Sequence, residues 1–180
     1  LQALELATGK KLFSTRLDAK TVAEAKQIYL LADALHWYIA FLSASDQPNQ
    51  GMRFAAVFNV AVLRTLPIHG PLLALDRATG ELRWQVDIPQ QGLILEQFEE
   101  LPLVLCASFR EVRLGAGPNN PERYRYVSTL LALDKRDGRV IDRTESPNGS
   151  QYTALRVDAA AGRIELLGHP LKVGFQLRGD

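Results

Sequence analysis

The feature that most constrains how this 180-residue chain can fold is a short pattern that occurs four times along it. Each copy has an acidic residue four positions before a glycine, between two apolar segments. A pattern that recurs within one chain is typical of folds in which equivalent units pack side by side. The copies contain Glu5, Thr8, Gly9 and Phe13; Ala74, Asp76, Thr79, Gly80 and Trp84; Asp134 and Gly138; and Asp158 and Gly162.

The chemistry of each copy predicts a tight β-hairpin. Glycine reaches the positive φ that such a turn needs without a steric clash, and an acidic side chain at its start can accept hydrogen bonds from the turn amides. In the first two copies an aromatic residue, Phe13 or Trp84, follows the glycine by four positions. Truncating a buried aromatic ring costs about 3–5 kcal/mol, several times the value of one hydrogen bond. We therefore expect the rings to hold neighbouring units together.

Unrelated hairpins in an ordinary β-sandwich are the alternative interpretation of the same residues. A sandwich also needs short strands and tight turns. It does not require the acid and the glycine to keep one spacing in every copy, nor two copies to share Thr-Gly and an aromatic at one offset. The repeat therefore favours a fold of equivalent units, and the sandwich stays open.

Two copies of the pattern resemble a known motif. Ala74–Trp84 resembles the A-x-D-x-x-T-G-x-x-x-W docking motif of the pyrroloquinoline-quinone-type (PQQ-like) β-propeller repeat, and Ala3–Phe13 is similar with conservative changes. The chain from Leu72 onward also resembles the C-terminal part of large PQQ-like propeller proteins of planctomycete-type bacteria, notably over Gln91–Pro102. The resemblance implies an all-β fold: a β-propeller fragment of the quinoprotein-dehydrogenase-like type, with antiparallel four-stranded blades, in an extracytoplasmic (periplasmic or cell-envelope) protein.

The resemblance also implies how the chain divides: a single partial β-propeller domain with about two full blades and partial ones. We expect the missing part to precede Leu1. Asp142 stands at the aromatic position of the third copy, and the fourth copy has no aromatic there, so we expect aromatic docking to fail at both. The segments are a half blade at 1–16, a blade at 26–87 with an insertion at 43–71, a blade at 92–144 with a long loop at 111–126, and a terminal blade at 151–178.

The region after the first copy allows two interpretations. The Ala-rich segment Asp18–Ala25 favours a short helix or a loop. Clusters of β-favouring residues at Gln27–Leu31 and Trp37–Leu42 predict strands. The alternative is one amphipathic helix that continues through Ile28 and Ala32, because helical spacing can be followed that far. We expect the strands.

Composition excludes several classes of protein. Lys and Arg number 21 and Asp and Glu number 20, so the net charge of +1 gives neither the basic footprint of a nucleic-acid-binding domain nor a polybasic membrane patch. No apolar run is long enough for a transmembrane helix. Because Cys106 is the single cysteine, the chain cannot form an internal disulfide, a Cys-rich zinc site or a thioredoxin-type pair.

The residues that could support catalysis do not form a recognisable set, so we expect no enzyme activity in this segment and no cofactor. Active quinone-dependent relatives of the motif hold the quinone against a Trp, with calcium bound by Glu, Asn and Asp and often an adjacent cysteine pair. This chain has only Cys106, which we expect to be buried and inert, and no matching calcium ligand set. His36, His69 and His169 lack metal-site spacing, and His69 stands in a predicted stiff turn, Pro67–Pro71.

A basic and aromatic cluster is the candidate for binding a partner. It flanks the predicted loop at 111–126, whose Gly, Pro and Asn content is typical of a surface excursion. A solvated loop is one interpretation, and an interface is the other, because Arg and Tyr are enriched at the energetic centres of interfaces. The cluster consists of Arg110, Arg113, Arg123, Tyr124, Arg125 and Tyr126.

Together these observations predict a non-catalytic binding or scaffolding module of a larger extracytoplasmic bacterial protein. Its partner would be another protein or the N-terminal remainder of the same chain, with no nucleic acid and no membrane span in this segment. Two alternatives stay open. One is the propeller part of an enzyme, quinoprotein-type or multidomain, whose active site lies outside this segment. The other is a propeller that senses a small ligand in its central channel.

Overall fold

The described part of the chain is built almost entirely from β-strands. The computed structural model describes residues 1–43, 63–113, 124–146, 151–168 and 172–177. Within these ranges it contains one helix, α1 (Ala19–Glu24), and the strands β1 (Gln2–Leu4), β2 (Lys11–Ser14), β3 (Ala25–Ala32), β4 (His36–Ser43), β5 (Thr65–Asp76), β6 (Leu82–Ile94), β7 (Leu103–Arg113), β8 (Tyr124–Asp134), β9 (Val140–Ser146), β10 (Tyr152–Asp158), β11 (Arg163–Gly168) and β12 (Lys172–Gln176).

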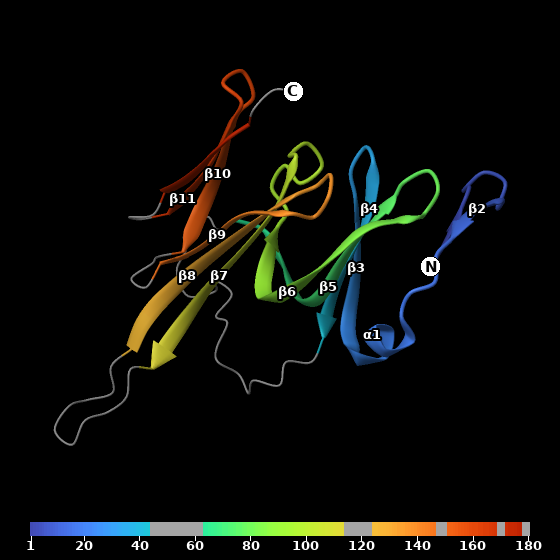
Figure 1. Cartoon of the computed structure of the whole chain (residues 1–180), viewed down its shortest axis with the longest axis horizontal. Helices are drawn as coiled ribbons and strands as arrows, with labels where there is room; N and C mark the ends of the chain where they lie inside the picture. Colours follow the sequence, from blue (N-terminus) through green and yellow to red (C-terminus); the bar gives the residue numbers. More distant parts are fainter. Residues whose placement is uncertain (44–62, 114–123, 147–150, 169–171, 178–180) are drawn as a thin grey trace.

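The strands form three antiparallel sheets (Figure 1). β1 pairs with β2, β10–β12 form a three-stranded sheet, and β3–β9 follow one another in chain order across a seven-stranded sheet. Antiparallel neighbours can be joined by tight turns, and the repeated glycines lie in such turns. The prediction of an all-β chain with antiparallel sheets is confirmed, with one short helix in addition.

Within the seven-stranded sheet, the pairing between neighbouring strands is shortest between β6 and β7. β6 pairs with β5 from Leu82 to Ile94, but it pairs with β7 only at Gly92 and Leu93. The ladders on either side of this junction are much longer. We therefore name two parts of the sheet separately: the first leaf is β3–β6, and the second leaf is β7–β9 with the end of β6. The sheet of β10–β12 is the third leaf.

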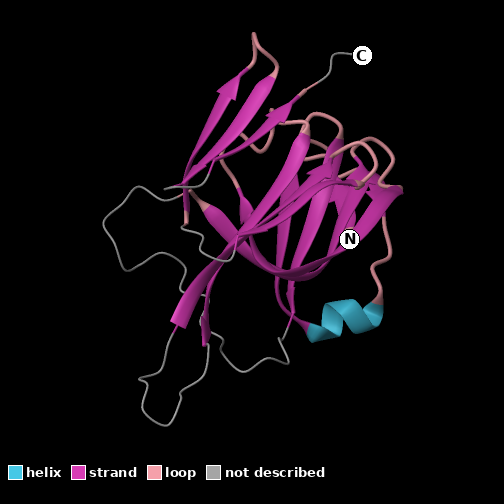
Figure 2. Ribbon diagram, turned by 60° about the vertical axis from the view of Figure 1, so that its left-hand side comes forward, coloured by secondary structure: helices cyan, strands magenta, loops and turns pink. Residues whose placement is uncertain are grey.

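The three leaves lie side by side (Figure 2), and clusters of buried apolar side chains lie between neighbours. Side chains alternate along β4: Tyr38 and Ala40 face the second leaf, whereas Ile39 and Phe41 belong to a separate cluster on the opposite face. Both faces of β4 are thus buried, which explains its uninterrupted apolar sequence. The layer between the first and second leaves includes Leu72, Ala74, Trp84, Val104, Cys106, Leu131 and Leu133, and the next layer includes Leu105, Leu130, Ala132, Tyr152, Ile164, Leu166 and Phe175.

A short helix precedes the first two strands of the first leaf. Asp18 caps α1, because its carboxylate accepts a hydrogen bond from the Thr21 amide at 2.8 Å. In β3, Ile28 and Leu30 are exposed and Tyr29 between them is partly buried, which is a period of two. The two predicted strands are therefore confirmed, and the alternative of one amphipathic helix is wrong.

The predicted insertion at 43–71 is too long at its C-terminal end. β5 begins at Thr65 and pairs with β6 from there, so His69 and the predicted turn around it lie inside a strand. Proline is tolerated at this place because β4 pairs with β5 only from His69 onward, so no described strand pairs with Pro67 on that side. Residues 44–62 of the insertion lie outside the described part of the chain.

The predicted loop at 111–126 is also too long. β7 continues to Arg113 and β8 starts at Tyr124, and these two residues are paired. The ladder between β7 and β8 extends past the point where β9 stops pairing, at Ser128, so the two strands continue as a two-stranded arm (Figure 1). We call residues 109–113 and 124–128 the arm. Residues 114–123 lie outside the described ranges.

Candidate functional site

The second copy of the repeat forms the turn between β5 and β6, with the hydrogen bonds that its residues predict. Gly80 has a φ of +73°, and its amide donates to the Asp76 carbonyl at 2.9 Å. One carboxylate oxygen of Asp76 accepts hydrogen bonds from the amides of Ala78 and Thr79, each at 2.9 Å. The Thr79 hydroxyl accepts one from the Glu81 amide at 3.2 Å. The acid and the threonine thus accept hydrogen bonds from different amides of the turn, and the glycine supplies its positive φ.

The other copies form related turns. The amides of Gly9 and Gly138 donate to the carbonyls of Glu5 and Asp134 at 2.8 and 2.9 Å. The two glycines have φ values of +69° and +72°. Gly162 of the fourth copy has a φ of +61°, but its amide donates to a carbonyl three residues back instead of four. All four repeat glycines therefore adopt the positive φ that the sequence predicts.

The aromatic residue of each of the first two copies packs on the glycine of the next copy. A Cβ atom added to Gly138 would lie 2.8 Å from the indole ring of Trp84, and one added to Gly80 would overlap the ring of Phe13. The Trp84 indole N–H donates to the Lys135 carbonyl at 2.8 Å, and Trp84 is only 6% exposed. The ring of Trp84 therefore fastens the first leaf to the turn of the second by apolar contact and one hydrogen bond.

In the last two copies no aromatic side chain follows the glycine by four positions, so neither copy supplies a ring that packs on another repeat glycine. Asp142 occupies the aromatic position of the third copy and accepts a hydrogen bond from the Thr144 hydroxyl at 2.9 Å. The atom nearest to a Cβ on Gly162 would be the Leu177 carbonyl oxygen, at 3.1 Å. The second and third leaves are joined instead by the apolar layer that contains Tyr152. Burial, with a contribution from Asp142, raises the pKa of Tyr152.

Arginine side chains keep the acids of two turns ionised. Arg83 Nη2 lies 2.6 Å from Asp76 Oδ2, and Arg136 Nη2 lies 2.8 Å from Asp134 Oδ2. The hydrogen bond from Arg83 holds the pKa of Asp76 well below its usual range, and the one from Arg136 lowers the pKa of Asp134. An ionised carboxylate is the better acceptor for turn amides, so these arginines reinforce the hairpins.

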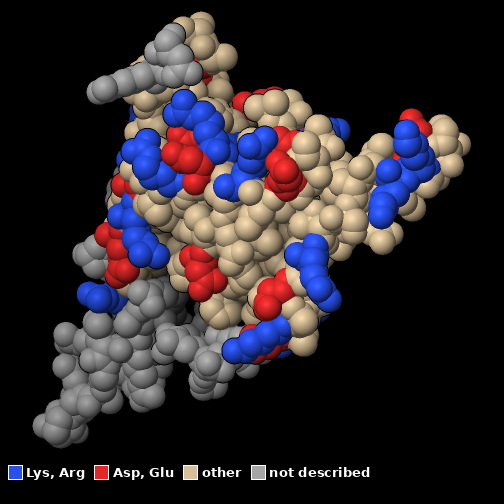
Figure 3. Space-filling model, turned by 45° about the vertical axis from the view of Figure 1, so that its right-hand side comes forward, with Lys and Arg blue, Asp and Glu red and all other residues tan. Residues whose placement is uncertain are grey.

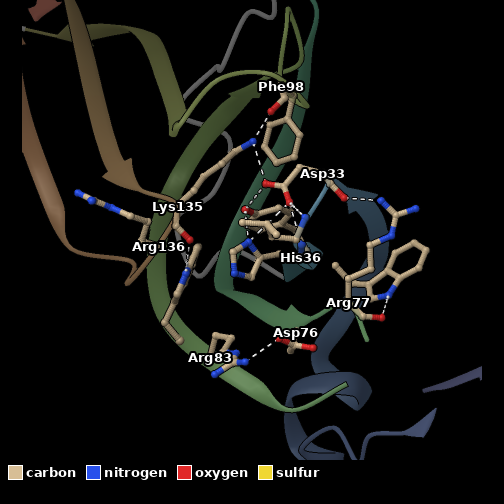
Figure 4. A network of polar contacts seen from close by, with 12 residues as sticks. Asp33, His36, Asp76, Arg77, Arg83, Phe98, Lys135 and Arg136 are labelled. Carbon is tan, nitrogen blue, oxygen red and sulfur yellow. Dashed lines mark hydrogen bonds and ion pairs between the residues drawn. The ribbon is translucent and has the colours of Figure 1, made fainter. Parts of the chain in front are cut away.

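A buried polar cluster that the sequence did not predict joins the first two leaves beside these turns (Figure 4). Lys135 Nζ lies 3.3 Å from Asp33 Oδ2, and the two residues are 4% and 8% exposed. The ammonium group also donates to the Phe98 carbonyl and lies 4.1 Å from the centre of the Phe98 ring. Asp33 Oδ2 accepts a hydrogen bond from the Tyr38 hydroxyl at 2.7 Å, and Asp33 Oδ1 accepts one from the His36 amide at 2.8 Å.

The electrostatics of this cluster are those of a buried structural ion pair. Burial lowers the pKa of Lys135, and the charge of Asp33 opposes this effect. Burial alone would raise the pKa of Asp33, but hydrogen bonds from Tyr38 and from two backbone amides, together with the charge of Lys135, lower it. Because both charges face protein groups and hardly any of their surface reaches solvent, the ammonium group is not placed to attack a substrate. No local pattern marks the pair, since its members are far apart in the sequence.

A hollow of about 460 Å³ lies at the other end of the first leaf, where α1 leads into β3. Its lining residues come from α1 and from β4, β5 and β6, and they include none of the repeat residues and none of the candidate partner-binding residues. One of them is His69, whose Nδ1 is buried and has no hydrogen-bond partner among the described residues. In the sequence, the hollow is marked by the cluster of Pro and Gly around His69, which predicts a turn.

The candidate partner-binding residues lie mostly on the arm. Arg110 and Arg113 are in β7, Tyr124, Arg125 and Tyr126 are in β8, and Arg123 lies outside the described residues. The ring of Tyr126 stacks on that of Phe109, with ring centres 5.1 Å apart and planes at 10°. Tyr126 is 48% exposed, and Arg125 is exposed as well. The arm thus presents an aromatic stack and a cation to solvent.

Cys106 is buried, and the histidines of the described ranges are not gathered into a metal site. Cys106 is fully buried, and burial raises the pKa of its thiol to about 12, so the prediction of a buried thiol is confirmed. Over the described ranges no three His, Cys, Asp or Glu side chains gather as a metal site, and His169 lies outside these ranges. Figure 3 shows acidic and basic side chains intermingled on one face of the molecule, in agreement with the balanced composition.

Comparisons with known proteins add no relative. No family model matches the sequence, and a search of curated proteins finds no match. No helix in the part of the chain that the structure describes is long and apolar enough to cross a membrane.

Proposed function

We propose that this chain is part of a PQQ-like β-propeller and acts as a non-catalytic binding or scaffolding module of a larger extracytoplasmic bacterial protein. The observation that carries the proposal is the contact of Trp84 with Gly138, which Phe13 and Gly80 repeat. In each case the aromatic residue of one repeat closes on the glycine of the next. A contact that recurs from unit to unit lets equivalent leaves follow one another around a common axis, as the blades of a propeller do.

Burial of the reactive side chains supports a non-catalytic role. Cys106 is enclosed in the layer between the first and second leaves, and Lys135 is held by Asp33 and by the Phe98 carbonyl. Neither group is placed to reach a substrate, because protein atoms cover both of them. These side chains contribute to the packing and pairing of the leaves, which is the work of a scaffold.

The arm is the surface that we assign to partner binding. Tyr126, stacked on Phe109, and the neighbouring Arg125 combine aromatic area with a cation, which are the side chains that contribute most to interfaces. The stack holds the Tyr126 ring in place before a partner arrives, which reduces the entropy lost on binding. The partner is another protein or the N-terminal remainder of the same chain.

Site-specific photo-crosslinking in the parent protein tests the binding role. With Tyr126→p-benzoylphenylalanine we expect a discrete crosslinked product, because the replaced ring lies exposed on the arm. Leu82 is the matched control position, since it is 52% exposed and lies in the first leaf, away from the arm. Equal products at the two positions, or none at position 126, would contradict the assignment.

The non-catalytic role is tested with the cofactor that the resemblance implies. Pyrroloquinoline quinone and calcium chloride are added to the protein together with primary alcohols and aldoses, and reduction of an electron-accepting dye is recorded. We expect no reduction above the rate without protein. Dye reduction that requires the protein, the quinone and calcium together would overturn the non-catalytic assignment.

A further inference from the structure

A row of three apolar side chains crosses the second leaf and is buried against the first leaf. Leu93 pairs with Cys106, and Cys106 pairs with Leu131, so the three side chains lie next to one another on one face. All three belong to the apolar cluster that contains Tyr38 and Ala40 of the first leaf, and Leu93 is fully buried in it. The row is therefore the surface that the second leaf offers to the leaf before it in the chain.

The first leaf has the matching row, but one end of it is exposed. Leu30 pairs with Ile39, and Ile39 pairs with Leu73. Leu73 lies three positions before the acid of its repeat copy, as Leu131 does, so the two rows occupy equivalent places. Leu30 is 54% exposed, whereas Leu93 at the equivalent position is fully buried. Within the described ranges, no leaf covers this end of the row.

The hairpin of β1 and β2 stands where a further leaf would begin, at the opposite end of the molecule from β10–β12 (Figure 1). The ring of Phe13 packs on Gly80. Leu17, four positions after Phe13, packs on the same face of the first leaf as the row. Ile88 stands at the same distance after Trp84 and is buried in the layer on the second leaf. The hairpin and the residues after it thus repeat part of the first leaf.

One edge of β1 has no strand bound to it among the described residues. β1 pairs with β2 alone, whereas the matching end of β5 pairs with β4 as well as with β6. An unpaired edge presents backbone N–H and C=O groups to a further strand. In the first leaf, the side chains of Tyr38 and Ala40 on β4 face the second leaf. A strand paired with β1 in the same way would turn its side chains toward Ile39 and Leu30.

The charged outer face of the third leaf argues against one occupant, a second copy stacked head to tail. Lys172 Nζ lies 2.8 Å from Glu165 Oε1, and Arg156 is the strand neighbour of Glu165, on the face away from the apolar cluster. Arg156 is exposed and stands two positions before the acid of its repeat copy, where the second and third copies have Ala74 and Ala132. A second copy would bury these charges against the apolar row of the first leaf, at a large cost in free energy.

We propose that this face of the first leaf binds a further leaf, made of β1, β2 and strands supplied by the residues that precede β1 in the parent chain. The added strand pairs antiparallel with the free edge of β1. Its apolar side chains cover Leu30 and also Ile28, which is 46% exposed and lies on the same face of β3. The packing continues the contact that Phe13 makes with Gly80. This inference rests on the proposed function and concerns a surface apart from the arm.

Thiol accessibility in the parent protein tests the proposal. The variants Leu30→Cys and, as the matched control, Val140→Cys are treated with N-ethylmaleimide, since Val140 in β9 is 49% exposed. We expect the thiol at position 30 to react at least about fiftyfold more slowly than the thiol at position 140, because a thiol in a closed layer reacts only when the layer opens. In denaturant the two rates should agree. Equal rates in the folded protein would overturn the proposal.

Photo-crosslinking identifies the occupant. With Leu30→p-benzoylphenylalanine we expect a product within one chain, and the attached peptide should precede Leu1 in the parent chain. If this variant disturbs the packing, Ile28→p-benzoylphenylalanine should give the same product. A crosslinked dimer, which would mean that a second copy is bound, or an attached peptide from another part of the chain would overturn the proposal. The crosslink at position 126 tests the proposed function separately, so its formation together with a reactive thiol at position 30 would overturn this inference alone.

Discussion

The indole ring of Trp84 fills the space that a side chain at Gly138 would need. The ring atoms lie 2.8 Å from the position of a Cβ on this glycine, so only glycine allows the approach. Gly138 also has a φ of +72°, which the turn itself requires. One residue therefore meets two demands, that of its own hairpin and that of the neighbouring leaf. The demand of the hairpin is common to all four repeat glycines, whereas the demand of a neighbouring ring applies to Gly80 and Gly138.

Removal of the docking ring should destabilise the chain strongly. Trp84→Ala leaves a cavity between the first and second leaves and removes the hydrogen bond to the Lys135 carbonyl, so we expect a loss of about 3–5 kcal/mol in the free energy of unfolding. Asp142→Ala, at the equivalent position of the third copy, should cost about 0.5 kcal/mol. Urea denaturation of both variants measures the difference, and equal losses would refute the docking role of Trp84.

A methyl group at the docking glycine should cost more than one at an open glycine. Gly9 and Gly138 have nearly the same φ, but a Cβ on Gly9 has no atom within 4 Å. Both Gly→Ala variants should lose about 1–2 kcal/mol through backbone strain. Gly138→Ala should lose at least ~1 kcal/mol more, because overpacking displaces Trp84. Thermal denaturation of the two variants separates the packing effect from the backbone strain. Equal losses of stability would mean that the Trp84 ring moves aside without a cost in free energy.

Breaking the buried ion pair should destabilise the chain far more than breaking an exposed one. Lys135→Met leaves Asp33 as a buried carboxylate without its cation, and we expect a loss of about 3–5 kcal/mol. Lys20→Met, which breaks the exposed pair with Glu24, should cost less than about 0.5 kcal/mol. Adding Asp33→Asn to Lys135→Met should restore part of the loss. A double variant less stable than Lys135→Met alone would argue against an ion pair as the contact that joins the first and second leaves.

The thiol should be unreactive in the folded chain. Burial raises the pKa of Cys106 to about 12, so almost no thiolate exists at pH 8, and the layer between the leaves blocks reagents. We expect Ellman's reagent to modify Cys106 at least about a hundredfold more slowly in buffer than in 6 M guanidinium, where one thiol should react completely. Rapid modification of the folded protein would show that the first and second leaves separate readily.

Acid should destabilise the fold through the carboxylates of the turns and of the buried pair. The pKa values of Asp33, Asp76 and Asp134 are lowered in the folded chain, whereas an aspartate in the unfolded chain has a pKa of about 3.9. The unfolded state therefore binds more protons, and the free energy of unfolding falls as the pH drops below about 4 and through the folded pKa values. Urea midpoints at pH 6, 4 and 3 measure this fall. A midpoint that stays constant would contradict the lowered values.

The turns of the repeat could be predicted from the sequence because each turn is held by its own residues. The carboxylate of Asp76 and the hydroxyl of Thr79 bond to amides only two or three positions away, and Gly80 supplies its φ by its own chemistry. The strands β3 and β4 were predicted for a similar reason, since their residue types favour extended backbone. Burial of Cys106 followed from its apolar neighbours.

Strand ends could not be predicted because a distant partner strand determines them. Thr65–Pro71 carries two prolines and a glycine, which locally favour a turn, yet its pairing with the second half of β6 keeps it extended. The same holds for Arg113 and Tyr124, which continue β7 and β8 because each supplies the other with a neighbour. Backbone hydrogen bonds formed across a sheet outweigh a local preference that is worth only about 1 kcal/mol per residue.

The sequence by itself determined the hairpins, the repeated glycines and the all-β class, because the forces involved act within a few residues. Only the tertiary structure decided that Trp84 closes on Gly138, that Lys135 meets Asp33, and that His69 lies beside a hollow. These arrangements depend on how leaves stack, and stacking is driven by burial of apolar area. That force has no direction of its own, so the particular pairs it brings together follow from the packed shape of the whole chain.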